Sequence, residues 1–176
     1  EAVDTLVMVN PLGLEDYQAK GVPPATIDEM AAGELRTTPA SLKAYQLKFY
    51  YNGVWKPQYD RWIDMQAGLY AGPGREAYVR TQARTSEMIF TQPVAHEFPR
   101  MQPRTVLIIG GKDRSAPGSG RAPPALAETL GRYDRLGREA AAAMPNATLV
   151  EMPQLGHSPQ MEDPDQFHAA LLKALG

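Results

Sequence analysis

The sequence predicts an α/β protein with parallel strands and a large helical insertion. Three short runs of β-forming residues, Thr5–Asn10, Thr105–Ile109 and Ala147–Met152, predict strands, and the first two are continuously apolar, as in strands buried on both faces. Helical patterns separate the three runs. Strand-helix-strand passages of this length require parallel pairing with right-handed crossovers, so we expect an open parallel sheet.

The composition is that of an ordinary globular protein. The chain has 176 residues, of which 43% are hydrophobic and 22% are charged, and its formal charge is -2. The small net charge argues against an electrostatic nucleic-acid binder. No apolar run approaches the roughly 20 residues of a membrane span, and no signal peptide opens the sequence. The absence of cysteine excludes a disulfide framework and a cysteine nucleophile, and it leaves cytoplasm and periplasm open as compartments.

Residues at the end of the first strand and at the start of the first helix predict where these two elements stop and begin. The strand over Thr5–Asn10 ends at Pro11 and Gly13, which break the β pattern. Farther on, Thr26 and Glu29 match a capping box, in which each side chain satisfies a backbone N–H group of the other residue's turn. Apolar residues then recur at helical spacing, so we expect a helix to begin here.

Three more helices are expected before the second strand. Thr38 before a proline predicts the start of the next helix, which we expect Gly53 to end. A further helix follows Pro57 and runs to the breaker Gly72-Pro73-Gly74. A weaker apolar stripe over Arg75–Phe90 predicts the last one, after which two prolines return the chain to the sheet.

These elements divide the chain into three parts. Residues 1–16 hold the first core strand and its exit loop, residues 17–100 form the helical insertion, and residues 101–176 supply two more strands and the C-terminal helix. The second strand is followed by a turn-rich loop, Arg114–Pro124, whose Gly and Pro content predicts a surface excursion. A helix with apolar positions from Leu126 to Met144 is expected to lead to the last strand.

Two residues suited to acid–base chemistry follow the second and third strands. Asp113 lies on the loop after the second strand, and His157 lies in a turn between the third strand and a helix opened by Asp163-Pro164. In open parallel α/β sheets, side chains just past the carboxyl ends of strands line active sites. An Asp and a His in this chain order predict the acid and the base of a catalytic triad.

The segment from Pro103 to Asp113, the Leu155-Gly156-His157 turn and the helix after it resemble the last third of an α/β-hydrolase-fold enzyme. The segment from Val9 to Tyr17 resembles the strand exit that precedes the cap of that family. The resemblance covers nearly the whole chain in the family's element order. It implies that the helical insertion is a cap that roofs the active site. No metal-ligand cluster stands out in the sequence, and no cofactor is expected.

The family's nucleophile elbow, G-x-S-x-G, precedes the first strand seen here, and the chain contains no such motif. The segment Gly156 to Gln160 matches it only superficially, because Pro159 has no backbone N–H group to donate to an oxyanion. We therefore expect the serine and the oxyanion hole to come from an N-terminal portion of the same protein. By the same reasoning, the chain on its own is expected to be inactive.

The acid and the reaction both have alternatives. Some members of the family carry the acid one strand earlier, which here makes Glu15 or Asp16 a candidate. His96 and His168 are expected to be structural, because neither follows a strand. Acyl-ester hydrolysis is the favoured reaction, since it is the commonest use of this constellation. Epoxide hydrolysis, haloalkane dehalogenation with Asp in place of Ser, and a non-catalytic binding role are the alternatives.

Aromatic residues are concentrated in the helical insertion, where the resemblance places the substrate pocket. Their helical spacing predicts that most of them pack the helices of the insertion against each other. Tyr50, Tyr51 and Trp55 lie near the helix end marked by Gly53, and they are the candidates for the pocket lining. As a group, the aromatics predict a small, uncharged and largely apolar substrate.

Overall fold

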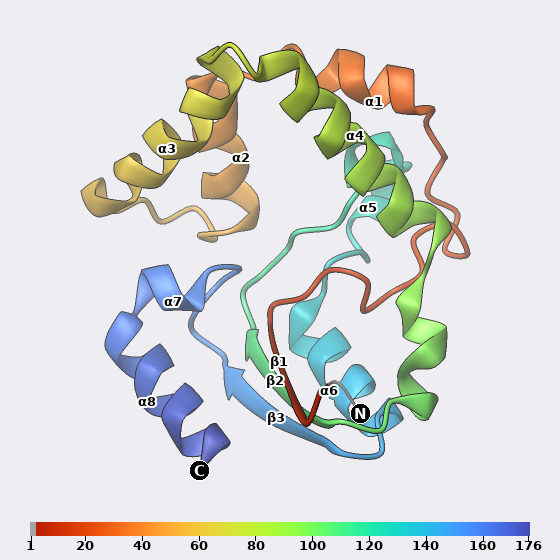
Figure 1. Ribbon diagram of the computed structural model, residues 1–176, viewed down its shortest axis with the longest axis vertical. Helices are drawn as coiled ribbons and strands as arrows, with labels where there is room; N and C mark the ends of the chain where they lie inside the picture. Colours follow the sequence, from red (N-terminus) through yellow and green to blue (C-terminus); the bar gives the residue numbers. More distant parts are fainter. Residues whose placement is uncertain (1–2) are drawn as a thin grey trace.

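The computed structural model describes residues 3–176, and it shows a three-stranded parallel sheet beneath a group of helices (Figure 1). The strands are β1 (Thr5–Val9), β2 (Arg104–Gly110) and β3 (Ala147–Met152). They are arranged in the order β1-β2-β3, and both neighbouring pairs are parallel. The predicted α/β class with parallel strands is therefore confirmed.

Four α-helices lie between β1 and β2, and the strand arrows in Figure 1 point toward them. They are α1 (Ile27–Glu34), α2 (Pro39–Phe49), α3 (Asp60–Ala71) and α4 (Arg75–Thr91). Two 3₁₀ helices, η1 (Pro57–Tyr59) and η2 (Val94–Arg100), belong to the same segment. The helical insertion thus lies over the carboxyl ends of the strands.

The starts of α1 and α2 are set by local hydrogen bonds. The Glu29 amide donates to Thr26 Oγ1 over 3.2 Å, and the Thr26 amide donates to the Glu29 carboxylate over 2.8 Å. Thr38 and Ser41 repeat this reciprocal arrangement, at 3.1 Å and 2.9 Å. Each box satisfies backbone N–H groups that lack a partner inside the helix, so both helix starts follow directly from the sequence.

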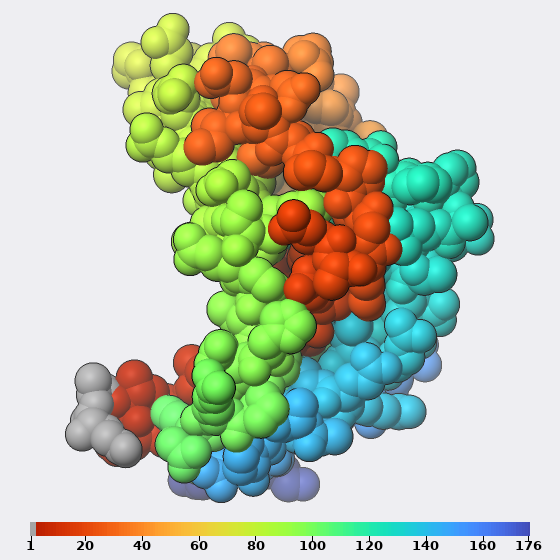
Figure 2. Space-filling view, turned by 90° about the vertical axis from the view of Figure 1, so that its right-hand side faces the viewer, coloured from red at the N-terminus to blue at the C-terminus, as the bar shows by residue number. Residues whose placement is uncertain are grey.

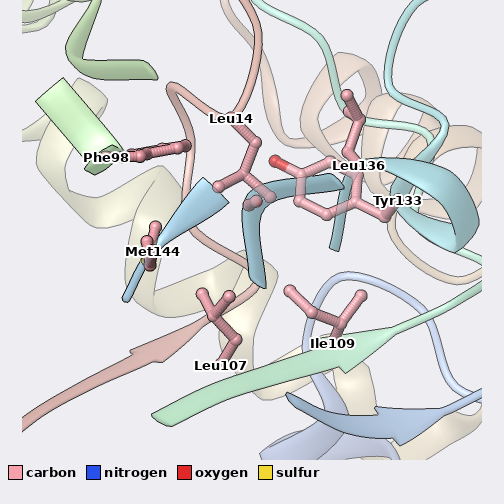
Figure 3. Packing of buried hydrophobic residues seen from close by; sticks show 8 residues of the cluster. Leu14, Phe98, Leu107, Ile109, Tyr133, Leu136 and Met144 are labelled. Carbon is pink, nitrogen blue, oxygen red and sulfur yellow. The ribbon is translucent and has the colours of Figure 1, made fainter. Parts of the chain in front are cut away.

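The central strand β2 is buried on both faces. One face packs on α6 (Tyr133–Ala143) and the other on α8 (Pro164–Leu175). Figure 3 shows the first of these cores, in which side chains from β2 meet those of α6 and of the segments around it. Its buried members are Leu14, Phe98, Leu107, Ile109, Tyr133, Leu136, Ala140 and Met144. The alternation along β2 explains why its apolar run is continuous.

The helical insertion has a core of its own and is joined to the sheet by a second cluster. Its own core gathers buried residues of α1, α2, α3 and α4: Ala31, Leu42, Ile63, Tyr70, Val79 and Ala83. The second cluster joins the β1 exit loop, α4 and the loop after β2 through Tyr17, Val22, Phe90, Ala116 and Leu130. Figure 2 shows these segments side by side, with the red and orange exit loop and α1 against the green α4.

Two expectations about helices were wrong. The single helix expected from Leu126 to Met144 is divided into α5 (Pro124–Ala127) and α6, with Gly131 between them at a φ of +62°. A Cβ atom at Gly131 would lie 2.7 Å from the Ser115 carbonyl oxygen, so only glycine permits this close approach. The helix expected to end at Gly53 ends at Phe49 instead.

The remaining short elements are η3 (Ser119–Arg121) in the loop after β2 and α7 (Pro159–Glu162) before α8. Among the strands of residues 3–176, β1 and β3 each pair on one side only, with β2. None of the helices described is both long enough and apolar enough to cross a lipid bilayer.

Candidate active site

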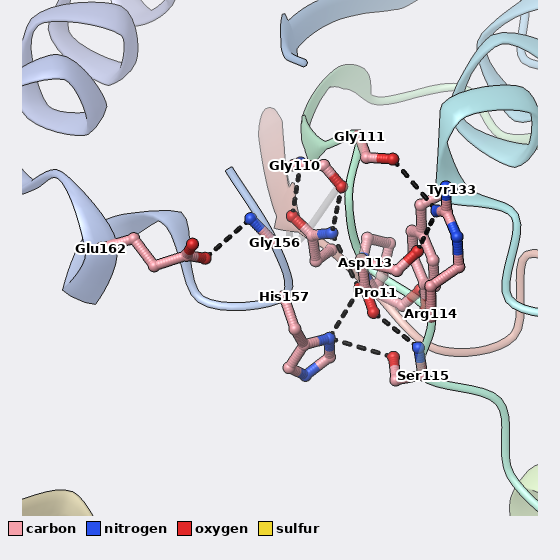
Figure 4. Close-up of polar contacts among 11 residues, drawn as sticks. Pro11, Gly110, Gly111, Asp113, Arg114, Ser115, Tyr133, Gly156, His157 and Glu162 are labelled. Carbon is pink, nitrogen blue, oxygen red and sulfur yellow. Dashed lines mark hydrogen bonds and ion pairs between the residues drawn. The ribbon is translucent and has the colours of Figure 1, made fainter. Parts of the chain in front are cut away.

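Asp113 and His157 meet at the carboxyl edge of the sheet. Asp113 follows β2 and His157 follows β3, and the parallel strands bring both loops to the same edge. His157 Nδ1 lies 2.6 Å from Asp113 Oδ2 (Figure 4). The Asp113 side chain is fully buried, whereas 20% of the His157 side chain is exposed. A histidine held at Nδ1 in this way keeps Nε2 available for proton transfer.

Two more donors hold the Asp113 carboxylate. The Ser115 amide donates to Oδ1 over 2.7 Å, and the Asn10 side-chain amide donates to Oδ2 over 2.9 Å. The Ser115 hydroxyl also lies 3.1 Å from His157 Nδ1. A buried carboxylate is costly unless its oxygens accept hydrogen bonds, and here both of them do.

Asn10 connects the ends of β1 and β2. Its Oδ1 atom accepts the Gly110 N–H group over 2.8 Å, and its Nδ2 atom donates to the Gly110 carbonyl over 3.2 Å as well as to Asp113. Asn10 is 3% exposed and has a φ of +40°, a conformation that asparagine tolerates better than most residues. Asn10 therefore holds the Asp113 carboxylate from the end of the neighbouring strand.

The C-terminal end of α2 is bonded to the loops that carry Asp113 and His157. The Tyr50 carbonyl accepts the His157 N–H group over 3.0 Å, and the Phe49 carbonyl accepts the Arg114 N–H group over 3.1 Å. The Tyr50 ring packs on the His157 ring, with 4.1 Å between their centroids. Burial raises the pKa of Tyr50 well above its ordinary value, so its phenol stays neutral.

The approach of α2 requires a glycine at position 156. A Cβ atom on Gly156 would lie 1.8 Å from the Tyr50 carbonyl oxygen, closer than atoms can come. The Gly156 N–H group donates to Glu162 Oε1 over 2.7 Å. Burial raises the pKa of Glu162, while this hydrogen bond acts in the opposite direction. The turn that carries His157 is thus fixed from two sides.

The structure separates the three aromatic candidates for the pocket. Tyr50 contacts His157, whereas Tyr51 stacks on Tyr59 with 4.1 Å between ring centroids. Trp55 packs edge-on against both Tyr51 and Tyr59, and its indole N–H donates to Asp60 over 3.0 Å. Tyr51 and Tyr59 line a separate cavity of about 230 Å³ that also includes Lys56. Of the three candidates, Tyr50 alone packs on His157.

The alternative acids and the other histidines lie apart from this pair. Glu15 forms an ion pair with Lys20 and accepts the Gly131 N–H group over 2.8 Å. His96 Nε2 lies 2.8 Å from Asp16 Oδ2 in a partly exposed pair. A hydrogen bond from Ala19 and the contact with His96 lower the pKa of Asp16. His168 is exposed on α8. Within residues 3–176, Asp113 is therefore the carboxylate that His157 contacts.

Two cavities lie beneath the helical insertion. The first, of about 480 Å³, lies between α2, α3 and α4, and its lining includes Tyr50 from beside His157. The second, of about 620 Å³, lies between α1, α4 and the loop after β2. The two cavities share Glu34, Tyr45, Ser86 and Pro117. Residues 3–176 contain no group of three or more acidic or histidine side chains placed to hold a metal ion.

Sequence reasoning predicted that Asp113 and His157 lie together because each follows a strand of the parallel sheet. It missed Asn10, Ser115 and the role of the Tyr50 carbonyl. Asn10 carried a weak signal as a polar residue at a strand end before a proline. The other two roles are defined by contacts between segments that are far apart in the sequence.

The chain belongs to the alpha/beta hydrolase family, whose family model matches residues 2–170. It is 49% identical to a probable hydrolytic enzyme from Pseudomonas aeruginosa, with a TM-score of 0.95 over 99% of this chain and 56% of that one. It shares the fold of an esterase from Exiguobacterium antarcticum at 15% identity and a TM-score of 0.62, over 97% of this chain and 56% of that one.

An enol-lactonase from Burkholderia xenovorans also has this fold, at 17% identity and a TM-score of 0.60, over 98% of this chain and 56% of that one. No curated protein matches the chain significantly. The chain thus spans 56% of the length of each of these three solved structures. Its length and its element order agree with the later part of an α/β hydrolase.

Proposed function

We propose that the chain supplies the cap and the acid–base half of a carboxylic-ester hydrolase with a Ser-His-Asp triad. The observation that carries the proposal is the 2.6 Å contact between His157 Nδ1 and the buried Asp113 carboxylate at the carboxyl edge of the sheet. Family membership and the likeness to a probable hydrolytic enzyme at 49% identity support it. The helical insertion, which lies above this edge, is the proposed cap.

In this proposal the serine and the oxyanion donors come from an N-terminal portion of the same protein. Two observations support this source. The matched structures are longer than this chain, which covers 56% of each. Among the described strands, β1 has a neighbour on one side only, so a further parallel strand can extend the sheet there.

The proposed reaction has two proton-transfer stages. His157 Nε2 takes the serine proton as the hydroxyl attacks the ester carbonyl, and it then gives that proton to the leaving alcohol. In the second stage His157 takes a proton from water, which attacks the acyl-enzyme, and returns it to the serine. Asp113 holds the imidazole in the required tautomer and stabilises the imidazolium in both stages.

The test is covalent labelling of the full-length protein with a fluorophosphonate, together with turnover of a short-chain aryl ester. We expect labelling of a serine outside this chain, and we expect His157→Ala to slow both labelling and turnover by about 10³-fold or more. His96→Ala is the matched control, because His96 contacts Asp16 instead of Asp113. Rapid labelling and turnover in His157→Ala would contradict the proposal.

A second candidate is epoxide hydrolysis, in which an aspartate replaces the serine. The observation that favours it is a pair of phenols at the end of α2: Tyr45 on the helix and Tyr50 just after it both line the 480 Å³ cavity, with 5.5 Å between their ring centroids. The ordinary pKa of a tyrosine is about 10, so the Tyr45 hydroxyl is protonated at neutral pH and can donate a hydrogen bond that polarises an epoxide oxygen. Turnover of styrene oxide without fluorophosphonate labelling would favour this candidate over the ester hydrolase.

A further inference from the structure

The 480 Å³ cavity, which we call the chamber, is connected to the acid–base pair through Tyr50. Its floor includes Leu12 from the loop after β1 and Pro117 from the loop after β2, both past the carboxyl ends of strands. Tyr50 belongs to its wall, and the same ring packs on His157 at 4.1 Å. A substrate whose reacting carbonyl lies at His157 can therefore place its remaining group in the chamber.

The walls of the chamber combine polar side chains with apolar and aromatic ones. Helices α2, α3 and α4 and the residues after α1 contribute amide and hydroxyl side chains, whereas four lining residues are aliphatic or proline. The uncharged polar set consists of Thr37, Ser41, Gln46, Gln66, Gln82, Thr85 and Ser86, the aliphatic and proline set consists of Leu12, Leu42, Ile89 and Pro117, and the aromatic set consists of Tyr45, Tyr50 and Tyr70. The tyrosine rings agree with the aromatic, largely apolar lining expected from the sequence, whereas the amide and hydroxyl side chains add hydrogen-bonding groups to it.

Part of the hydrogen-bonding capacity of these walls is unused. Gln46 is buried and donates to Gln66 Oε1 over 2.9 Å, which leaves the Gln66 NH₂ group without a bond to another described residue. The half-buried side chains of Gln82 and Ser86 form no hydrogen bond within residues 3–176. Half-buried polar groups of this kind require a partner from water or from a ligand.

The charge of the chamber restricts what it can bind. Among its lining residues, Glu34 is the one with a charged side chain, and its carboxylate accepts the Tyr70 hydroxyl over 2.6 Å. Burial and this neighbouring carboxylate raise the pKa of Tyr70, so the phenol remains protonated and donates to Glu34. A fixed negative charge repels an anionic substrate group and leaves neutral groups acceptable.

We infer that the chamber takes a neutral substrate group that carries a hydrogen-bonding function, such as an amide, instead of a plain alkyl chain. The inference rests on the proposed hydrolase function and names the substrate class of that site. An amide can exchange hydrogen bonds with Gln66, Gln82 and Ser86, whereas an alkyl chain leaves these groups unpaired. The volume of about 480 Å³ is in the range of small-molecule pockets.

The test compares matched esters with the full-length protein. The first pair, 4-nitrophenyl 4-acetamidobutanoate and 4-nitrophenyl heptanoate, varies the acyl group. The second pair, 3-acetamidopropyl acetate and hexyl acetate, varies the alcohol group. Within each pair the chains have equal length and differ only in the amide. We expect the wild-type protein to have the higher kcat/KM for the amide ester in at least one pair.

The variants locate this preference in the chamber. Gln82→Leu is expected to lower the amide-to-alkyl ratio of kcat/KM by about threefold to tenfold, which corresponds to the loss of one hydrogen bond. Gln66→Leu should act in the same direction, although it also removes the partner of Gln46. Gln58→Leu is the matched control, since Gln58 is exposed on η1 outside the chamber lining and its substitution should leave the ratio unchanged.

Two results would overturn the inference. One is a wild-type preference for the alkyl ester in both pairs. The other is an amide preference that persists in both Gln66→Leu and Gln82→Leu. If no ester is hydrolysed and His157→Ala behaves as the wild type, the proposed function fails instead. In that case, the binding of 4-acetamidobutanamide and heptanamide is compared by calorimetry. Tighter binding of 4-acetamidobutanamide that is lost in Gln82→Leu supports the inference, and tighter binding of heptanamide overturns it.

Discussion

Substitution of Asn10 tests how the acid is held in place. Asn10→Gly removes the bond to Asp113 and the two bonds to Gly110, while glycine still accepts the φ of +40°. A hydrogen bond to a charged group contributes about 1.5–3 kcal/mol, and a neutral one contributes about 1 kcal/mol. With water replacing part of these bonds, we expect a loss of about 2–4 kcal/mol in the free energy of unfolding.

Comparison with alanine separates the energetic cost of the positive φ from the contribution of the hydrogen bonds. Asn10→Ala loses the same bonds and also places a Cβ-bearing residue without a polar side chain in the left-handed region, which adds about 1 kcal/mol. Asn52 is the matched control, because it has a φ of +51°, is exposed and has no side-chain bond to the catalytic loops. Asn52→Gly should be nearly neutral, and Asn52→Ala should cost about 1 kcal/mol.

The assay is denaturant unfolding of the full-length protein, combined with kcat for a short-chain aryl ester. Both Asn10 variants should lower kcat by at least tenfold, because Asp113 is then held less firmly against His157, whereas both Asn52 variants should keep wild-type kcat. Wild-type stability and kcat in Asn10→Gly would show that the Asn10 bonds contribute nothing. A large stability loss with unchanged kcat would show that Asn10 supports the fold but does not position the acid.

Three other outcomes are expected. Gly156→Ala should lower both Tm and kcat, since its Cβ would lie 1.8 Å from the Tyr50 carbonyl oxygen, whereas Gly68→Ala, with open space at its Cβ, should be neutral or stabilising. Asp16→Asn should destabilise the protein at pH 7. The pKa of Asp16 is lowered in the folded state, so its ionised carboxylate stabilises the fold at pH values above the ordinary pKa of 3.8. This stabilisation disappears as the pH falls through the lower pKa of the folded state. Urea melts at pH 7 and pH 3 measure this difference, and an equal effect at both values would contradict it. The chain of residues 1–176 alone should hydrolyse no aryl ester and should self-associate in sedimentation through the open edge of β1; turnover by a stable monomer would refute both points.

The sequence predicted the elements whose signals are local. The strands followed from apolar runs, and the starts of α1 and α2 followed from Thr26 and Thr38, because capping boxes involve residues three positions apart. Asp113 and His157 were found by topology, since parallel strands bring their carboxyl ends to one edge. These predictions needed no knowledge of side-chain packing.

The features that the sequence did not predict depend on contacts between distant segments. The break between α5 and α6 is stabilised by the bond from Gly131 to Glu15, 116 residues away. Asn10 reaches Asp113 across 103 residues, and its role becomes visible only when β1 and β2 are adjacent. The amide side chains in the chamber lining were also missed, because helical spacing identifies buried aromatics but not the amides that face a cavity.

The most direct test of the central claim is a double-mutant cycle at His157 and Asp113 in the full-length protein. Each of His157→Ala and Asp113→Asn should lower kcat far more than it changes KM, and the double variant should be about as slow as the slower single variant, because both residues serve one proton transfer. Additive effects would contradict a shared role. Near-normal kcat in Asp113→Asn together with a severe loss in Asp16→Asn or Glu15→Gln would place the acid after β1 and contradict the assignment of Asp113.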